Sequence, residues 1–206
     1  MPNHLHINQP RLNQQIDGII FDLDGTLVDS SLNFTLMRQH LGCPLGEDIL
    51  QFIASMADPL QRQQAADLII EHEMNDAEIS RWLPGAQQLI NLLHQHKIPQ
   101  AIVTRNSADA TRIKVNNNQI PIEIISTREN HRPKPAPDAL LAIAQSWKIA
   151  PQRLMYVGDY LYDVQAGNNA GMFSCLITHG KIVDYSHQAD YVYSQIDQLT
   201  AALFTV

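Results

Sequence analysis

The sequence contains only two cysteines among its 206 residues, Cys43 and Cys175. They stand far apart and belong to no Cys-x-x-Cys or Cys/His pattern, so neither a disulfide framework nor a zinc site is indicated. Each cysteine is expected to pack as a small apolar side chain.

Positive charge is also scarce. Lys and Arg together number 14, against 21 Asp and Glu, which gives a formal net charge of −7. Nucleic acid is not an expected partner, because binding a phosphate backbone needs clustered Lys and Arg. A small anionic substrate is compatible with this net charge, because its binding depends more on the local electric field at the site than on the charge of the whole protein.

Long hydrophobic runs are absent from the sequence. No apolar stretch approaches the roughly 18 residues that suggest a membrane span, so no membrane partner is expected. The segment MPNHLHINQPRLNQ lacks a basic region followed by an apolar core, so it does not resemble a signal peptide. We expect this segment to be a polar, poorly ordered arm and the protein to be cytoplasmic, as a monomer or homodimer.

What the sequence does contain is an alternation of short apolar strands and amphipathic helices. Strands are expected at 16–23, 100–104, 122–126, 154–157, 173–178 and 191–193, and helices at 86–96, 108–116, 138–147, 164–170 and 196–203. This alternation predicts an α/β fold built from right-handed βαβ units around a doubly wound parallel sheet.

One segment breaks the alternation. Residues 32–83 contain no strand-like stretch and predict helices at 32–41, 47–57, 59–74 and around 77–82. A connection this long in a compact domain is usually functional. We therefore predict a core formed by residues 1–31 and 84–206, with residues 32–83 as an inserted helical cap.

The first expected strand ends in two carboxylates, Asp22 and Asp24. If the strand continues through them, both side chains point to one face. Two like charges so close repel each other unless a cation lies between them or one is protonated. Gly25 permits a sharp turn and the close approach of a ligand. The alternative is a buried strand that ends in a simple Asp-Gly turn, which is common.

The second expected strand ends in Thr104-Arg105-Asn106-Ser107, where a helix begins. A hydroxyl group and free amides at a helix N-terminus form an anion site. The alternative is that Asn106 or Ser107 only caps the helix, and both interpretations can hold together.

Two further strands are followed by charged residues. Lys134 lies between two prolines that stiffen its loop, so its ammonium has a preset direction that suits a phosphate. Asp159 directly follows the 154–157 strand, and Asp163 comes one helical turn later. Such oxygen ligands suit Mg²⁺. The alternatives are a rigid linker with a solvated lysine, and aspartates that only cap a helix.

Four patterns occur in this order along the chain: DLDGTLVDS at residues 22–30, Thr at 104, Pro-Lys-Pro at 133–135, and the Gly-Asp-x-x-x-Asp pattern GDYLYD at 158–163. Together they resemble the four motifs of the haloacid dehalogenase-like hydrolase superfamily, in its phosphatase branch. The resemblance implies a Rossmann-like core with a small all-helical cap after the first strand, as in phosphoglycolate phosphatase-like members. Arg105 and Tyr160 depart from the residues that many relatives carry there.

The resemblance also implies roles for these residues in the hydrolysis of a small phosphorylated metabolite. Asp22 is the expected nucleophile, forming an aspartyl-phosphate, and Asp24 the general acid and base. Mg²⁺ is the expected cofactor. The expected metal residues are Asp22, Asp24 through its carbonyl, Asp159 and Asp163. Asp163 either binds the metal through water or orients Lys134. The expected phosphate-binding residues are Thr104, Arg105, Asn106 and Lys134.

Other activities of the superfamily fit the sequence less well or stay open as alternatives. Asp24 argues against a dehalogenase, and the absence of lysine from residues 32–83 argues against a phosphonatase. A sugar phosphomutase shares all four motifs and stays open as the alternative. A non-catalytic binding or regulatory protein of the same fold is less favoured, because none of the key acids is missing.

Overall fold

The computed structural model describes residues 12–204 and is built around a single six-stranded sheet. The strands follow the order β3-β2-β1-β4-β5-β6, and every neighbouring pair is parallel. They are β1 (Gly18–Phe21), β2 (Gln100–Val103), β3 (Ile124–Ser126), β4 (Leu154–Gly158), β5 (Phe173–Ile177) and β6 (Tyr191–Tyr193). The predicted doubly wound α/β fold is confirmed.

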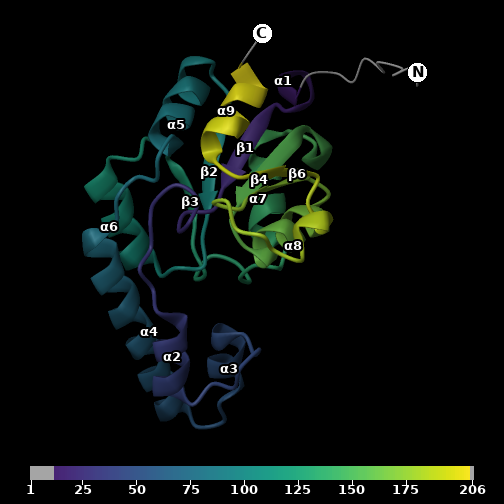
Figure 1. Ribbon diagram of the computed structural model, residues 1–206. Helices are drawn as coiled ribbons and strands as arrows, with labels where there is room; N and C mark the ends of the chain where they lie inside the picture. Colours follow the sequence, from purple (N-terminus) through teal and green to yellow (C-terminus); the bar gives the residue numbers. More distant parts are fainter. Residues whose placement is uncertain (1–11, 205–206) are drawn as a thin grey trace.

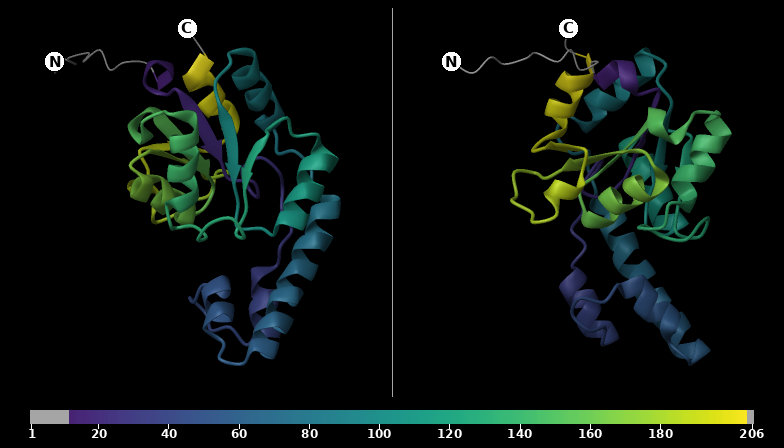
Figure 2. Two further views of the ribbon diagram at one scale, coloured as in Figure 1. Left: turned by 180° about the vertical axis from the view of Figure 1, so that it is seen from behind. Right: turned by 90° about the vertical axis from the view of Figure 1, so that its right-hand side faces the viewer.

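Helices cover both faces of the sheet (Figures 1 and 2). On one face α1 (Leu12–Gln15), α5 (Ala86–Gln95) and α9 (Ile196–Phe204) share a core with Ile19 and Phe21. On the other face α7 (Asp138–Trp147) and α8 (Leu161–Ala170) share a core with Ile20. Because successive side chains of a strand alternate between faces, the apolar run of β1 supplies both cores.

Between β1 and α5 the chain leaves the sheet and forms a helical insertion (Figure 1). It consists of α2 (Phe34–Leu41), α3 (Ile49–Ser55) and α4 (Pro59–Ile79), which enclose an apolar cluster of their own. The C-terminal part of α4 packs against α6 (Ala108–Asn118) of the core. The insertion is therefore joined to the core by this helix pair as well as by its two linkers.

Some predicted boundaries were wrong. Residues 59–79 form one continuous helix rather than two, because no glycine or proline interrupts the chain between Met74 and Ala77. The helix α8 begins at Leu161 instead of 164, since the Asp163 carboxylate accepts a hydrogen bond from the Tyr160 amide and so extends its first turn. The β1 strand is shorter at both ends than the predicted 16–23.

The predicted N-terminal arm lies mostly outside the described residues. Its last part is not a polar arm, because Leu12–Gln15 is helical and Leu12 packs into the core. Two short 3₁₀ helices, Pro151–Arg153 and Ser186–Gln188, complete the described elements. Within residues 12–204, no helix has the length and apolar character that crossing a bilayer requires.

Candidate active site

The candidate site lies at the carboxyl ends of β1 and β4. The chain proceeds from β1 outward to β3 on one side and from β4 outward to β6 on the other, so the strand order reverses between β1 and β4. Ligands of open α/β sheets bind beyond the strand ends at such a switch point. Asp22 directly follows β1, and Asp159 directly follows β4.

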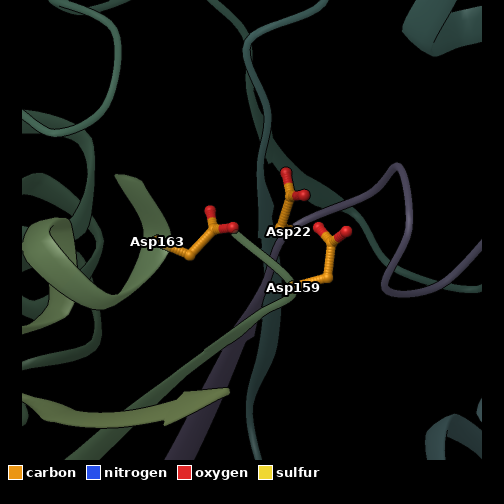
Figure 3. Close-up of side chains that lie close together, drawn as sticks. All are labelled: Asp22, Asp159 and Asp163. Carbon is orange, nitrogen blue, oxygen red and sulfur yellow. The ribbon is translucent and has the colours of Figure 1, made fainter. Parts of the chain in front are cut away.

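Three carboxylates meet at this point: Asp22, Asp159 and Asp163 (Figure 3). One oxygen atom from each lies within 4.8 Å of the other two. Hard oxygen donors of this kind are the ligands that Mg²⁺ and other divalent cations prefer. The group thus has the composition and spacing of a site that could hold a divalent metal ion.

The space beside Asp159 is open only because residue 25 is glycine. Its φ of +74° disfavours any other residue, and a Cβ there would lie 2.3 Å from Oδ2 of Asp159. The predicted role of Gly25, a sharp turn with close approach to a ligand, therefore fits the backbone. A larger residue would displace the Asp159 carboxylate from the group.

The crowding of these carboxylates shifts their protonation. Burial, together with the charges of Asp163 and Asp24, raises the pKa of Asp22 to about 7, although Lys134 opposes the shift. Burial and the neighbouring Asp22 and Asp163 raise the pKa of Asp159 to about 8. The protein alone does not compensate the negative charge here, and a divalent cation would supply the missing positive charge.

Lys134 provides the positive charge that the protein itself contributes. Its ammonium lies 2.6 Å from Oδ1 of Asp22 and 2.6 Å from Oδ1 of Asp163, and its side chain is 5% exposed. Burial alone would lower the pKa of Lys134, but Asp163 and Asp22 raise it, so the ammonium stays charged. The alternative of a solvated lysine on a rigid linker is wrong.

Asp163 has protein partners for both of its oxygens. Oδ1 accepts hydrogen bonds from Lys134 and from the Tyr156 hydroxyl, while Oδ2 accepts one from the Tyr160 amide. A Cβ on Gly158 would overlap Asp163 at 2.2 Å, so this close packing also depends on glycine. Of its two predicted roles, the one that this geometry favours is orienting Lys134. The helix-capping interpretation also holds, through Oδ2.

Asp24 lies apart from the three carboxylates. The expectation that it shares one strand face with Asp22 was wrong, because β1 ends at Phe21 and the alternation of a strand does not extend to the two aspartates. Its carboxylate bonds Lys114 and Asn106. Burial raises the pKa of Asp24, and the charge of Lys114 and these two hydrogen bonds oppose the rise.

The residues after β2 contact Asp24 through Asn106. Thr104 is buried, and its hydroxyl accepts a hydrogen bond from the Asn106 amide. The Asn106 side chain donates to Oδ2 of Asp24 at 2.5 Å. Ser107 caps α6 as the helix-capping interpretation predicted, since its hydroxyl accepts from the Ala110 amide.

Arg105 does not lie free in solvent. Its guanidinium donates to Oδ2 of Asp48 in the helical insertion and to the Lys134 carbonyl, both at 2.5 Å. It also lies over the ring of Tyr162, 4.8 Å from the ring centre. Arg105 thus joins the N-terminus of α3 to two loops of the site.

Sequence reasoning missed Lys114 and Asp76, which lie next to Asp24. Lys114 is fully buried on α6, and Asp76 is buried on α4. One signal was available: Lys114 lies four residues after Ala110 and four before Asn118, so it occupies the face of α6 that is buried against α4. His179 was also missed; its Nε2 lies 2.6 Å from the Gly25 carbonyl.

Comparison with known proteins relates most of the described chain to one family. The family model "haloacid dehalogenase-like hydrolase" matches residues 19–177. A haloacid dehalogenase-like hydrolase domain-containing protein of Arabidopsis thaliana is 34% identical over 79% of this chain and 71% of its own length. Hexitol phosphatase A of Escherichia coli is 33% identical over 89% of this chain and 93% of its own.

More distant similarities agree with these. A phosphoglycolate phosphatase of Shigella dysenteriae is 27% identical, covering 92% of this chain and 93% of its own. The solved structure of a haloacid dehalogenase-like family hydrolase from Streptococcus pneumoniae superimposes with a TM-score of 0.72 at 22% identity. It covers 91% of this chain and 98% of that one, so the two share the fold over nearly their full lengths.

Proposed function

Because the chain belongs to the family of haloacid dehalogenase-like hydrolases, in its phosphoglycolate phosphatase-like branch, we propose that it is a Mg²⁺-dependent phosphatase of a small phosphorylated metabolite. The observation that carries the proposal is the group formed by Asp22, Asp159 and Asp163 around Lys134 at the carboxyl ends of β1 and β4. In this group Asp22, which we propose as the nucleophile, lies beside a buried cation and beside carboxylates suited to a divalent metal.

In the first proposed step, a carboxylate oxygen of Asp22 forms a bond to the phosphorus of a phosphomonoester. The bond between phosphorus and the ester oxygen breaks, and protonated Asp24 gives its proton to that oxygen, which leaves as an alcohol. In the second step, water attacks the phosphorus of the aspartyl-phosphate while Asp24 accepts a proton. Inorganic phosphate leaves, and Asp22 is a free carboxylate again.

The surrounding residues stabilise the charge of the transferring group. The ammonium of Lys134, the hydroxyl of Thr104 and the backbone amides of Arg105 and Asn106 are the proposed phosphate contacts. Asp22, the Asp24 carbonyl and Asp159 would hold Mg²⁺, with Asp163 acting through Lys134. When bound, this ion supplies positive charge that neutralises the phosphoryl oxygens.

The names of two relatives support the proposed substrate class. They are hexitol phosphatase A and phosphoglycolate phosphatase, and both names refer to small molecules. We propose that residues 32–83 act as the cap, which excludes water and selects the leaving group. The cytoplasmic location and the monomeric or dimeric state stay predictions.

Hydrolysis of p-nitrophenyl phosphate by the purified chain tests this function, with Mg²⁺ or with EDTA. We expect turnover only with the metal, and a loss of at least about 10³-fold in Asp22→Asn, because removing a nucleophile costs this much or more. Asp17→Asn is the matched control: it makes the same change in an exposed ion pair with Arg153, just before β1, and should keep activity. No turnover of this compound or of a phosphorylated-metabolite panel by the folded wild type would refute a phosphatase and favour the mutase alternative.

A further inference from the structure

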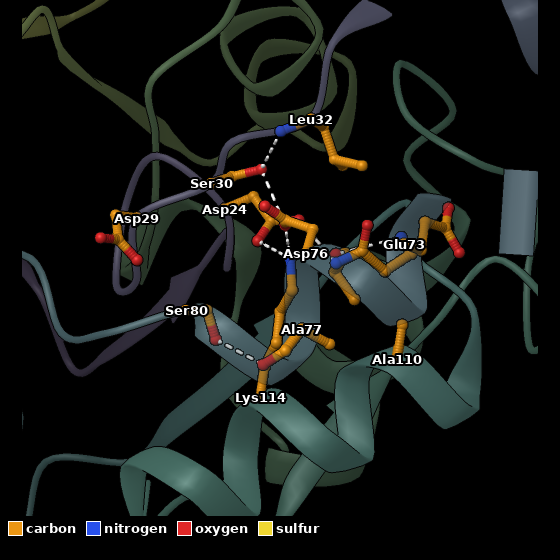
Figure 4. A network of polar contacts seen from close by, with 12 residues as sticks. Asp24, Asp29, Ser30, Leu32, Glu73, Asp76, Ala77, Ser80, Ala110 and Lys114 are labelled. Carbon is orange, nitrogen blue, oxygen red and sulfur yellow. Dashed lines mark hydrogen bonds and ion pairs between the residues drawn. The ribbon is translucent and has the colours of Figure 1, made fainter. Parts of the chain in front are cut away.

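Lys114 is a fully buried lysine whose ammonium lies between two carboxylates. It donates hydrogen bonds to Oδ1 of Asp24 and, at 2.6 Å, to Oδ2 of Asp76 (Figure 4). Its side chain is 0% exposed. Burying a lysine ammonium costs free energy unless it is paired, so helix packing alone does not account for a lysine at this position.

The contact fixes the direction of the Asp24 carboxylate. Lys114 occupies Oδ1, while the Asn106 side chain donates to Oδ2. With a partner on each oxygen, the carboxylate has one favoured orientation. Proton transfer to a leaving group depends on such positioning, because the donor must lie within hydrogen-bond reach of the accepting oxygen.

The second contact reaches the base of the helical insertion. Asp76 lies near the end of α4 and also accepts a hydrogen bond from the Ser30 hydroxyl at 3.0 Å (Figure 4). Two more come from the Ser31 amide and the Ser31 hydroxyl, at 2.5 and 2.9 Å. Ser30 and Ser31 belong to the linker that leads from the Asp24 loop into the insertion. Lys114 therefore connects Asp24 to the point where both ends of the insertion meet the core.

Holding α4 on α6 is not a sufficient role for Lys114. A separate ion pair, between Glu73 of α4 and Arg128 of the core, already ties this part of α4 down. Glu73 also accepts a hydrogen bond from the Ser107 amide at 3.0 Å. An apolar residue in place of Lys114 would pack the two helices without the cost of burying a charge.

We propose that Lys114 is a positioning residue for the general acid. It orients the Asp24 carboxylate toward the leaving-group oxygen. Because Lys114 also bonds Asp76, this orientation depends on the base of the insertion. This inference rests on the proposed phosphatase function, in which Asp24 protonates the leaving alcohol. It adds a residue from α6, outside the four sequence motifs, to the residues that control the reaction.

Two aryl substrates of similar shape test the inference. The p-nitrophenolate anion is a good leaving group and needs little protonation, whereas phenolate needs the proton from the acid. In Lys114→Met we expect kcat for phenyl phosphate to fall at least about tenfold more than kcat for p-nitrophenyl phosphate, because general acid catalysis contributes roughly 10²–10⁴-fold. KM should change little for either substrate, since Lys114 is enclosed and does not bind them.

Arg128→Met is the matched control. It breaks the other ion pair between α4 and the core and does not touch Asp24, so its effect on the two substrates should be equal. Lys114→Met leaves the Asp24 and Asp76 carboxylates without the cation that lies between them and is a risk to folding. If it does not fold, Lys114→Met combined with Asp76→Asn removes one of these two carboxylates, and Asp76→Asn alone is then its reference.

Each outcome has a defined meaning. A selective loss on phenyl phosphate in the folded lysine variant, absent in Arg128→Met, supports the positioning role. An equal loss on both substrates, or no loss, overturns it and leaves the phosphatase function standing. Absence of Mg²⁺-dependent turnover in the wild type overturns the proposed function itself, and the inference with it, before any variant is compared.

Discussion

The raised pKa values at the carboxylate group predict an unusual dependence of stability on pH. A carboxyl group whose pKa is higher in the folded than in the unfolded protein stabilises the fold at low pH, and this contribution is lost as the pH rises. For Asp22 and Asp159 the window runs from the unfolded value of 3.8 to folded values of about 7 and about 8. The metal-free protein should therefore lose stability between about pH 4 and pH 8.

The size of the loss follows from the shift. The rise of the Asp22 pKa from 3.8 to about 7 corresponds to roughly 4 kcal/mol at about 1.4 kcal/mol per pH unit. The rise of the Asp159 pKa from 3.8 to about 8 corresponds to roughly 6 kcal/mol on the same scale. Part of this shift arises from repulsion between the two residues, so the two values are not added, and we expect roughly 6 kcal/mol for the site as a whole. The pKa values of Lys114 and Lys134 are raised above 10.5, so the contribution of these lysines is lost only above this window.

A bound divalent cation should reverse the trend. The ion competes with protons for the carboxylates, so it should stabilise the fold more at pH 8 than at pH 5. A ligand present at one hundred times its dissociation constant stabilises by about 2.7 kcal/mol. The stability of the protein in saturating Mg²⁺ should thus vary much less with pH than that of the metal-free protein.

Urea unfolding followed by circular dichroism at pH 5, 6, 7 and 8 measures both trends, in EDTA and in Mg²⁺. Asp159→Asn is the control, because it removes the carboxyl group with the larger of the two pKa shifts; it should reduce the pH dependence and weaken the Mg²⁺ effect. If the free energy of unfolding of the wild type in EDTA stays constant or rises from pH 5 to pH 8, the electrostatic description of the site is refuted.

Two further predictions concern the surroundings of the site. Gly25→Ala should reduce the apparent Mg²⁺ affinity in thermal-shift titrations, because its Cβ displaces Asp159. Gly42→Ala is the control, since Gly42 also has a positive φ but open space around its Cβ. It should lower the free energy of unfolding by only about 1 kcal/mol and keep the Mg²⁺ affinity. Arg105→Met should increase amide hydrogen exchange in α3, because it removes the ion pair with Asp48 that holds the N-terminus of this helix. Unchanged exchange would show that other contacts hold α3.

The sequence was sufficient to locate the residues at the strand ends. Asp22, Thr104 and Asp159 each follow a short apolar run, and in a parallel sheet the carboxyl ends of neighbouring strands meet at one edge. Local pattern and topology together therefore bring these positions to one place. Lys134 required the family resemblance as well, because a lysine between two prolines does not reveal by itself which carboxylates it will meet.

The contacts of Asp24 could not be predicted in the same way. Its partner Lys114 lies on α6 and also bonds Asp76 on α4, so these contacts depend on the packing of segments that are far apart in the sequence. The pattern shows that Lys114 lies on a buried face and that Asp76 lies on another, but two charged residues on two helices do not specify each other. Only the packed structure shows that Lys114 lies between Asp24 and Asp76.

Each of the two aspartates of the first motif is paired with a different lysine, and the two lysines come from different parts of the fold. The proposed nucleophile Asp22 is held by Lys134 from a loop of the core, whereas the proposed proton donor Asp24 is held by Lys114, which also contacts Asp76 of the insertion. A change at the base of the insertion would then alter protonation of the leaving group more than attack on phosphorus. Substitutions near Asp76 should accordingly affect alkyl and phenyl phosphates more than activated esters, while leaving Mg²⁺ binding intact.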